Sequence, residues 1–263
     1  ALSDIDIRKK LYHIITDKTK NLHMRKSILE IIHHFDSDDI IEIILSTMND
    51  PELSILEKIS TGLIKISKLR SFQKIELVKI DREIQSLAKR AFQLHIFYES
   101  LHPNMTSNLI KDHIKNDLSI LIPIILRLGT LKEPKIPIET YIRYIESNDP
   151  DLMPLVIELV ESTFSPIAGK LTIPLIDSAI NPLDVASDLF KENFLSEDEM
   201  LIFWINNSHY WKTLIAIHYC ILNENVKLLK QIDWSEIPID LFKNNIYTKS
   251  EQEYLNRNFF NKK

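Results

Sequence analysis

The amino-acid sequence predicts an all-α protein built as an α-solenoid, a right-handed superhelix of packed helix pairs. Of its 263 residues only 3 are glycine and 11 are proline, which disfavours the tight hairpin turns of a β-rich fold. Apolar residues recur at helical spacing and nowhere alternate over the length of a strand. Helix-start signals, in which Asp, Asn or Ser precedes Pro or acidic residues, return along the chain.

The first two helix pairs are expected over 17–48 and 50–100. Residues 37–39 (Ser-Asp-Asp) open an apolar run, and Asp50-Pro51 places an N-cap before a proline in the first helical turn. Near the end of the second pair, apolar residues follow a heptad-like seam along one long helix, which predicts packing inside the domain, with a coiled-coil dimer as the alternative. The seam consists of Ile80, Ile84, Leu87, Ala91, Leu94, Tyr98 and Leu101.

Three further pairs are expected over 105–147, 150–178 and 197–222. The phrase Asn-Asp-Pro-acid-Leu of residues 49–53 returns at 148–152 and predicts a second helix start with Asp149 as N-cap. Ser196 and Glu199 have the spacing of a capping box. Residues 223–263 are expected to cap the last pair, so that 1–263 form a single domain.

An internal repeat supports the solenoid. Segments 24–35 and 55–66 overlay at a constant offset of 31 residues, and five of six paired positions are apolar or small in both. The pairs are Met24/Ile55, Arg25/Leu56, Ile28/Ile59, Ile31/Gly62, Ile32/Leu63 and Phe35/Ile66. Any two amphipathic helices can be overlaid in this way, but a helical repeat of about this length is typical of α-solenoids.

Residues 155–164 read LVIELVESTF, residues 171–177 read LTIPLID, and residues 211–216 read WKTLIA. These three segments resemble HEAT repeats, the helix pairs of armadillo-like solenoids in bacterial proteins. The segments are most similar to HEAT domains that are attached to transporter-like membrane proteins resembling nucleotide translocases. The resemblance implies HEAT-like helix pairs and supplies no catalytic residues. Leu56 departs from it, because HEAT repeats often have Arg at that position.

Composition excludes several classes of function. With glycine only at 62, 129 and 169, the chain lacks a dinucleotide fingerprint, a P-loop and a nucleophile elbow. The single cysteine, Cys220, cannot form an internal disulfide and is expected in the core. The sequence shows neither a signal peptide nor an apolar run of the roughly 20 residues needed to span a bilayer. We expect a cytoplasmic protein, or a fragment held at a membrane by a missing part.

Charge is distributed unevenly around the net value of −5. Residues 58–90 contain nine basic and three acidic residues, whereas 133–199 contain fourteen acidic and four basic residues. A solvated helix face is the plain interpretation of the basic stretch, and binding to an acidic protein or to lipid headgroups is the functional one. The candidate partner-binding residues are Lys65, Lys68, Arg70, Lys74, Arg82, Lys89 and Arg90.

Two alternatives involve other chemistry. Glu30-x-x-His33 and Glu99-x-x-His102, the latter with His95 one turn before Glu99, have the spacing found in di-iron helical bundles. No Glu precedes Glu30 to complete that pattern, so no metal is expected, and Glu99 and His102 stay as weak candidate ligands.

Nucleic-acid binding is the other alternative, because some HEAT-type solenoids are DNA glycosylases. Those enzymes use a Trp with an acidic residue one turn away. The residues four positions after the three tryptophans are Ser208, Ile215 and Pro238. Nucleic acid is therefore not expected. We expect a non-enzymatic interaction or regulatory scaffold without a cofactor, whose partner is a protein or its own membrane domain.

Overall fold

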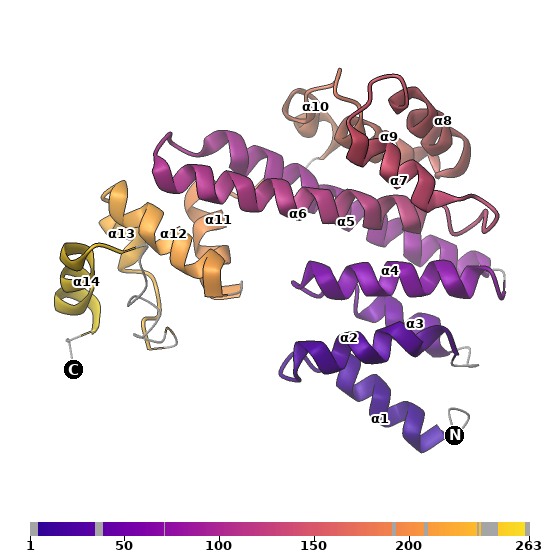
Figure 1. Cartoon of the computed structure of the whole chain (residues 1–263), viewed down its shortest axis with the longest axis horizontal. Coiled ribbons are helices and arrows are strands. Elements are labelled where there is room, and N and C mark those ends of the chain that lie inside the picture. The colour runs from indigo at the N-terminus through magenta and orange to yellow at the C-terminus, as the bar shows by residue number, and fades with distance from the viewer. Residues whose placement is uncertain are drawn as a thin grey trace. The chain divides into compact units, whose positions relative to one another are not determined.

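A computed structural model describes residues 5–34, 39–70, 72–190, 193–207, 210–235, 237 and 247–260. All regular secondary structure in these ranges is helical, which confirms the predicted all-α class (Figure 1). The helices of the first half are α1(Ile5–Thr16), α2(Leu22–Ile31), η1(Ile32–His34), α3(Asp39–Ser46), α4(Leu53–Ser67), α5(Lys74–Ser100) and α6(Met105–Gly129). Those of the second half are α7(Ile138–Ser147), α8(Met153–Thr163), α9(Pro166–Ile176), α10(Pro182–Leu189), α11(Glu197–Asn207), α12(Tyr210–Leu222), α13(Val226–Leu229), α14(Lys249–Leu255) and η3(Asn256–Phe260).

The chain divides into two compact units. Unit 1 comprises Ala1–Phe92 with Asp117–Lys191, and unit 2 comprises Gln93–Asn116 with Glu192–Lys263. The division falls inside α5 and inside α6, so each of these long helices contributes residues to both units. The prediction of one solenoid domain over 1–263 stays a prediction.

The N-terminal helices of unit 1 pack on helices one and two positions along the chain. The backbone of α1 lies against α2 and α3, and α2 lies against α4. The helix pair predicted over 17–48 would join α2 to α3. The main neighbours of α2 are instead α1 and α4. Helices α1 and α10 lie outside all the predicted pairs.

The repeat at offset 31 is only partly visible in the burial of its members. Arg25 and Leu56 are both buried, as are Ile28 and Ile59. Met24, however, is 49% exposed, whereas its counterpart Ile55 is fully buried. The position of Phe35 lies outside the described residues, as do Ser37 and Asp38 of the predicted cap.

The two Asn-Asp-Pro phrases begin helices later than predicted. Helix α4 starts at Leu53 and α8 at Met153, so neither Asp50 nor Asp149 is an N-cap. Instead, Asp50 Oδ1 accepts a hydrogen bond from Glu52 N (2.9 Å). In the same way, Asp149 Oδ1 accepts one from Asp151 N (3.0 Å). Each aspartate therefore forms an Asx turn that stabilises the segment before the helix. A carboxylate that makes this turn is no longer available to cap the helix.

The apolar faces of the long helices are buried. The predicted seam of α5 is buried at every apolar position from Ile80 to Leu101, with Tyr98 half-buried, so the prediction of internal packing is confirmed. The last residue of α6 is Gly129, and a Cβ built there would lie 2.0 Å from Phe164 Cζ. Gly129 is thus the position at which α6 lets the ring of Phe164 approach the backbone.

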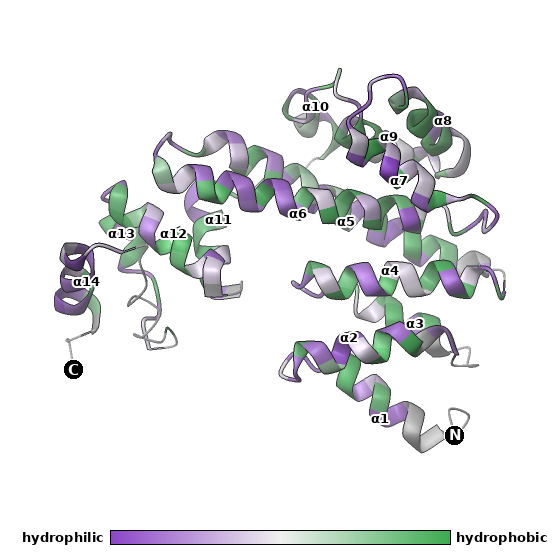
Figure 2. Cartoon of the chain, in the orientation of Figure 1, coloured by the Kyte–Doolittle hydropathy of each residue, from purple (hydrophilic) through white to green (hydrophobic). Residues whose placement is uncertain are grey.

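The rest of unit 1 is a succession of short helices. Helix α7 packs on α8, α8 on α9, and α9 on α10. Ser165 and Asn181 cap α9 and α10 by accepting hydrogen bonds from Ala168 N and Leu183 N. Each of these helices begins with a proline, whose missing N–H costs nothing in the first turn. Figure 2 shows that α8 and α9 are largely hydrophobic.

Unit 2 is organised around α12, which packs on α11 and α13. The predicted capping box is confirmed, since Ser196 N donates to Glu199 Oε2 (2.8 Å) and Glu199 N donates to Ser196 Oγ (3.4 Å). Trp204 of α11 is buried edge-on against Phe97, with ring centres 5.4 Å apart. Cys220 is buried in α12 as predicted, and burial raises the pKa of its thiol to about 12.

Polar contacts join the described part of the C-terminal segment to α12. Tyr247 Oη donates to Leu214 O (2.6 Å), and His218 Nε2 lies 3.4 Å from Glu251 Oε1. Glu251 also closes the capping box of α14 with Thr248. Figure 2 shows α14 as mainly hydrophilic, although its last residue, Leu255, is buried.

Candidate functional site

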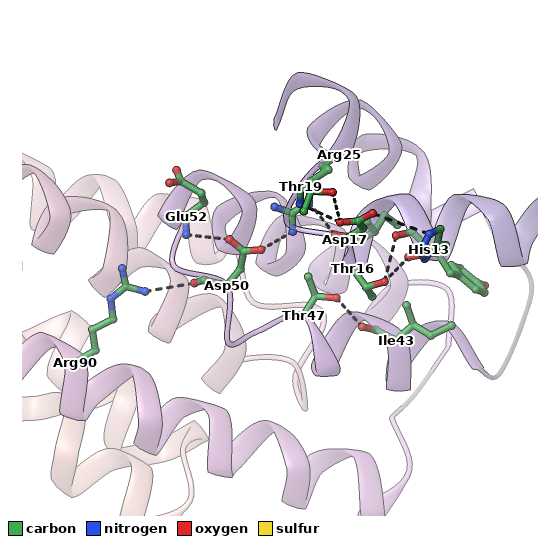
Figure 3. A network of polar contacts seen from close by, with 12 residues as sticks. His13, Thr16, Asp17, Thr19, Arg25, Ile43, Thr47, Asp50, Glu52 and Arg90 are labelled. Atoms are coloured by element: carbon green, nitrogen blue, oxygen red, sulfur yellow. Dashed lines mark hydrogen bonds and ion pairs between the residues drawn. The ribbon is translucent and has the colours of Figure 1, made fainter. Parts of the chain in front are cut away.

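Arg70 and Arg90, which belong to the seven basic residues predicted to bind a partner, make internal contacts. The Arg70 guanidinium donates to both carboxylate oxygens of Glu76 at 3.2 and 2.7 Å. Arg90 donates to the carbonyl oxygens of Asp50 (3.5 Å) and Pro51 (2.8 Å), and it is half-buried (Figure 3). Both side chains therefore hold loops of unit 1 in place.

The other five basic residues differ in exposure. Lys65, Lys68 and Arg82 are exposed, and Lys89 is half-buried, while the side chain of Lys74 lies outside the described residues. Lys68 helps to lower the pKa of Glu139, although the hydrogen bond from Arg127 is the main cause. The binding role of this basic face stays a prediction.

A buried ion pair lies beside Arg90. Arg25 of α2 pairs with Asp50 in the loop before α4, and the side chains of both residues are at most 3% exposed. Arg25 Nε also donates to Ile15 O in α1 (2.9 Å). Figure 3 shows how Asp50 connects Arg25, Glu52 and Arg90. Because buried charges need such partners, this network has a structural role.

A small hollow adjoins the ion pair in unit 1. Its volume is about 60 Å³, and it is lined by Thr16, Lys18, Ser46, Thr47, Asn49 and Asp50. Ligand pockets for organic molecules usually measure about 300 Å³ or more, so the hollow has room for ordered water but not for a metabolite.

The weak metal candidates lie at the end of α5 and just beyond it. Glu99 is exposed in the last turn of α5, whereas His102 lies beyond the end of that helix and donates its backbone N–H to Tyr219 Oη (2.8 Å). Burial lowers the pKa of His95 against the opposing effect of Glu99. Glu30 forms an ion pair with Lys58 (2.6 Å). Within the described ranges, no three His, Cys, Asp or Glu side chains are grouped so that they could hold a metal ion.

Exposed apolar side chains gather at one corner of unit 2. Met105 is 78% exposed and Leu109, one turn further along α6, is 42% exposed. Leu222 at the end of α12 is 42% exposed, and Val226, which begins α13, is 39% exposed. We name these four residues the corner patch.

Hydrogen bonds across long sequence separations fix the corner. They join His102 N to Tyr219 Oη (2.8 Å), Asn104 Nδ2 to Asn223 Oδ1 (3.3 Å), and Thr106 Oγ1 to His218 Nδ1 (2.9 Å). Met105 directly follows Asn104, and Leu222 directly precedes Asn223. The Asn104–Asn223 hydrogen bond therefore brings the segment that begins α6 close to the segment between α12 and α13.

The corner patch continues into an exposed stripe along α6. Asn108, Asp112, Lys115 and Asn116 are exposed, and with Met105 and Leu109 they recur at the spacing of one helix face. From 105 to 116 this face is about 17 Å long at 1.5 Å per residue. The sequence did not indicate that it would be exposed, because Leu109 is as apolar as its buried neighbour Ile110.

These features define the chain as an all-helical protein with a solvent-exposed apolar corner. Comparisons with family models, with curated proteins and with solved structures found no match. Among the described helices, none combines the length and apolar character required to cross a membrane.

Proposed function

We propose that this protein is a non-enzymatic interaction module of HEAT-like α-solenoid type, and that its corner patch binds an amphipathic helix of a protein partner. The observation that carries the proposal is the position of Met105, which is 78% exposed beside three further exposed apolar residues. Exposed apolar residues scattered singly need no explanation, but a rigid cluster with a polar rim is typical of a protein-binding site.

The packing of the N-terminal helices supports the solenoid part of the proposal. The α1–α3 and α2–α4 contacts join helices two positions apart in the chain, as is common between successive helix pairs of α-solenoids. Arg25 adds to this, because the internal overlay pairs it with Leu56, where HEAT repeats often have Arg. Solenoids commonly present extended surfaces to partners, which suits a binding role.

The dimensions and chemistry of the α6 stripe support a helix as the occupant. Its length of about 17 Å matches three turns of a partner helix. Methionine adapts its shape to different apolar side chains, and Met105 lies at the most exposed point of the corner patch. Lys111 and Lys115 follow along α6, so the apolar corner adjoins positive charge.

A display library of 16-residue amphipathic helices, selected against the whole chain, tests the proposal. We expect selected peptides to bind at least tenfold more weakly to Met105→Asp and to Leu222→Asp, as measured by fluorescence anisotropy. Ile167→Asp is the matched control, because Ile167 is 60% exposed on α9 of unit 1. An equal loss in the control, or no loss in the patch variants, would contradict binding at the corner patch.

The resemblance to transporter-attached HEAT domains adds a setting to the proposal. In this setting the module is the cytoplasmic domain of a larger bacterial protein, and its partner helix belongs to the same membrane assembly. The complete reading frame tests the setting, and a frame that encodes no membrane-spanning helix would contradict it. The binding proposal at the corner patch is independent of that outcome.

A further inference from the structure

Tyr98 of α5 lies against two lysines of α6. Lys111 Nζ is 4.6 Å from the centre of the Tyr98 ring, and Lys115 Nζ is 5.7 Å from it. Tyr98 and Lys111 are half-buried, while Lys115 is exposed. We name these three side chains the lysine–tyrosine seat. It lies wholly within unit 2.

The positive charge of this seat has no anionic partner in the described part of the chain. Within 4 Å of either ammonium group there is no carboxylate of a described residue, although Glu99 and Asp112 are close in sequence. The ring attracts both cations through its electron-rich face, but a neutral ring cannot cancel their charge. Two like charges at positions i and i+4 of one helix also repel each other, so an anion bound between them would stabilise the arrangement.

The position of the seat indicates what kind of anion fits it. Lys111 and Lys115 follow Met105 and Leu109 by six residues each, which is about 9 Å along the helix axis. Lys115 belongs to the exposed stripe that begins at Met105, and Lys111 lies one turn before it at the edge of that stripe, so a helix docked along the stripe would pass Lys115 and approach Lys111 from the side. Carboxylates on that helix would find two cations whose positions the ring of Tyr98 already restricts.

We propose that the lysine–tyrosine seat binds carboxylate side chains of an acidic protein segment. This inference rests on the proposed function for its occupant, and it adds the charge that the partner helix must carry. Glu or Asp residues one to two turns beyond the apolar anchors of that helix would fix its direction along α6, because only one orientation places them on the lysines.

The test uses a capped hexaglutamate peptide with the full chain at low salt, and follows the Tyr98 ring resonances by NMR. We expect the Lys111→Gln/Lys115→Gln double variant to reduce the affinity at least fivefold. The Lys132→Gln/Lys135→Gln variant removes the same charge from two exposed positions of unit 1, and it should change the affinity by less than twofold. Hexaglutamine should not shift the Tyr98 resonances.

Other outcomes would overturn the proposal in recognisable ways. Equal losses in both double variants would mean that only net charge matters. Inorganic phosphate binding to the seat more tightly than the peptide would contradict an acidic protein segment as the occupant. Because hexaglutamate lacks apolar anchors, a negative result with this peptide leaves the corner-patch experiment unaffected. If the corner-patch variants instead bind helical peptides normally, the effect of the lysine substitutions on hexaglutamate binding can still be measured.

Discussion

The side-chain amide of Gln93 holds the backbone of Leu195 from both sides. Its Oε1 accepts a hydrogen bond from Leu195 N (2.6 Å), and its Nε2 donates one to Leu195 O (2.9 Å). Gln93 is 9% exposed, so water cannot easily replace either bond. A single side chain thereby satisfies both peptide groups of the segment that leads into α11.

Replacing this amide tests its contribution. Gln93→Leu keeps the volume of the side chain but leaves the N–H and C=O of Leu195 unsatisfied, so we expect it to lower the free energy of unfolding by about 2 kcal/mol. Urea denaturation monitored by circular dichroism measures the change. Gln231→Leu is the control because Gln231 is exposed, and a comparable loss there would argue against a special role for Gln93.

The buried Arg25–Asp50 pair predicts strong coupling between the two substitutions. Asp50→Asn leaves Arg25 charged and buried, and should cost about 3–5 kcal/mol of unfolding free energy. Arg25→Met/Asp50→Asn should recover part of that loss, because the unpaired charge is gone. The exposed Glu30–Lys58 pair provides the comparison, and Glu30→Gln should leave the unfolding midpoint unchanged. Additive effects of the Arg25 and Asp50 substitutions would contradict the coupling.

Two glycines predict opposite results for the same substitution. Gly129→Ala places a methyl group on the ring of Phe164 and should lower the free energy of unfolding by about 1–3 kcal/mol. In Gly169→Ala the new Cβ has no neighbour closer than 3.8 Å. The higher helix propensity of Ala should therefore raise the free energy of unfolding by about 0.5–1 kcal/mol. If Phe164→Leu did not relieve the Gly129→Ala defect, the steric explanation would be wrong.

Attachment of the C-terminal segment to α12 should weaken at acidic pH. Burial alone would raise the pKa of Glu251, but hydrogen bonds from Thr248 and the charge of His218 hold it below the ordinary value of 4.5. A depressed carboxyl pKa means that this stabilisation is complete above 4.5 and is lost as the pH falls through the folded-state pKa. The loss therefore occurs on the acidic side of 4.5.

The indole N–H resonance of Trp234 can report this loss. Its ring stacks on Phe259 with centres 4.7 Å apart, so release of the segment should move the resonance. Glu251→Gln should shift the resonance at neutral pH and remove the acid transition attributed to Glu251. An unchanged acid transition in that variant would assign the effect to another carboxyl group.

Binding to duplex DNA separates the interaction module from its nucleic-acid alternative. Because Arg70 and Arg90 make contacts inside unit 1, we expect no salt-sensitive mobility shift of labelled duplex by the whole chain. Lys65→Gln/Lys68→Gln serves as the matched variant, since both lysines are exposed. A shift at low salt that this variant abolishes would favour the alternative.

The sequence was informative wherever a structure depends on neighbouring residues. The helical class, the burial of Cys220 and the Ser196–Glu199 capping box all follow from local patterns, and all are confirmed. The predicted Asp50 cap was wrong because Asp50 Oδ1 accepts a hydrogen bond from Glu52 N in an Asx turn, while its other oxygen pairs with Arg25, 25 positions earlier in the chain. Asp149 makes the same turn, so the spacing of the Asn-Asp-Pro phrase fits a turn as well as a cap.

The candidate site was less accessible to sequence reasoning. Met105 and Leu109 have the spacing of a buried helix face, and only the positions of α12 and α13 decide that they stay exposed. Similarly, Arg90 belongs to a basic stretch that resembles a binding face, but the loop at Asp50 and Pro51 captures it. Exposure depends on distant segments, which a single sequence does not place.

The hydrogen bonds between residues 102–106 and α12 also bear on the order in which the chain can fold. Their partners are separated by 112 to 119 residues, so they cannot form on a ribosome until α12 has been synthesised. Until then Phe97, Ile110 and Ile114 lack the later part of unit 2 that helps to bury them. During translation this stretch therefore keeps apolar surface uncovered until residues 197–222 have emerged, and transiently exposed surface of this kind is prone to aggregate.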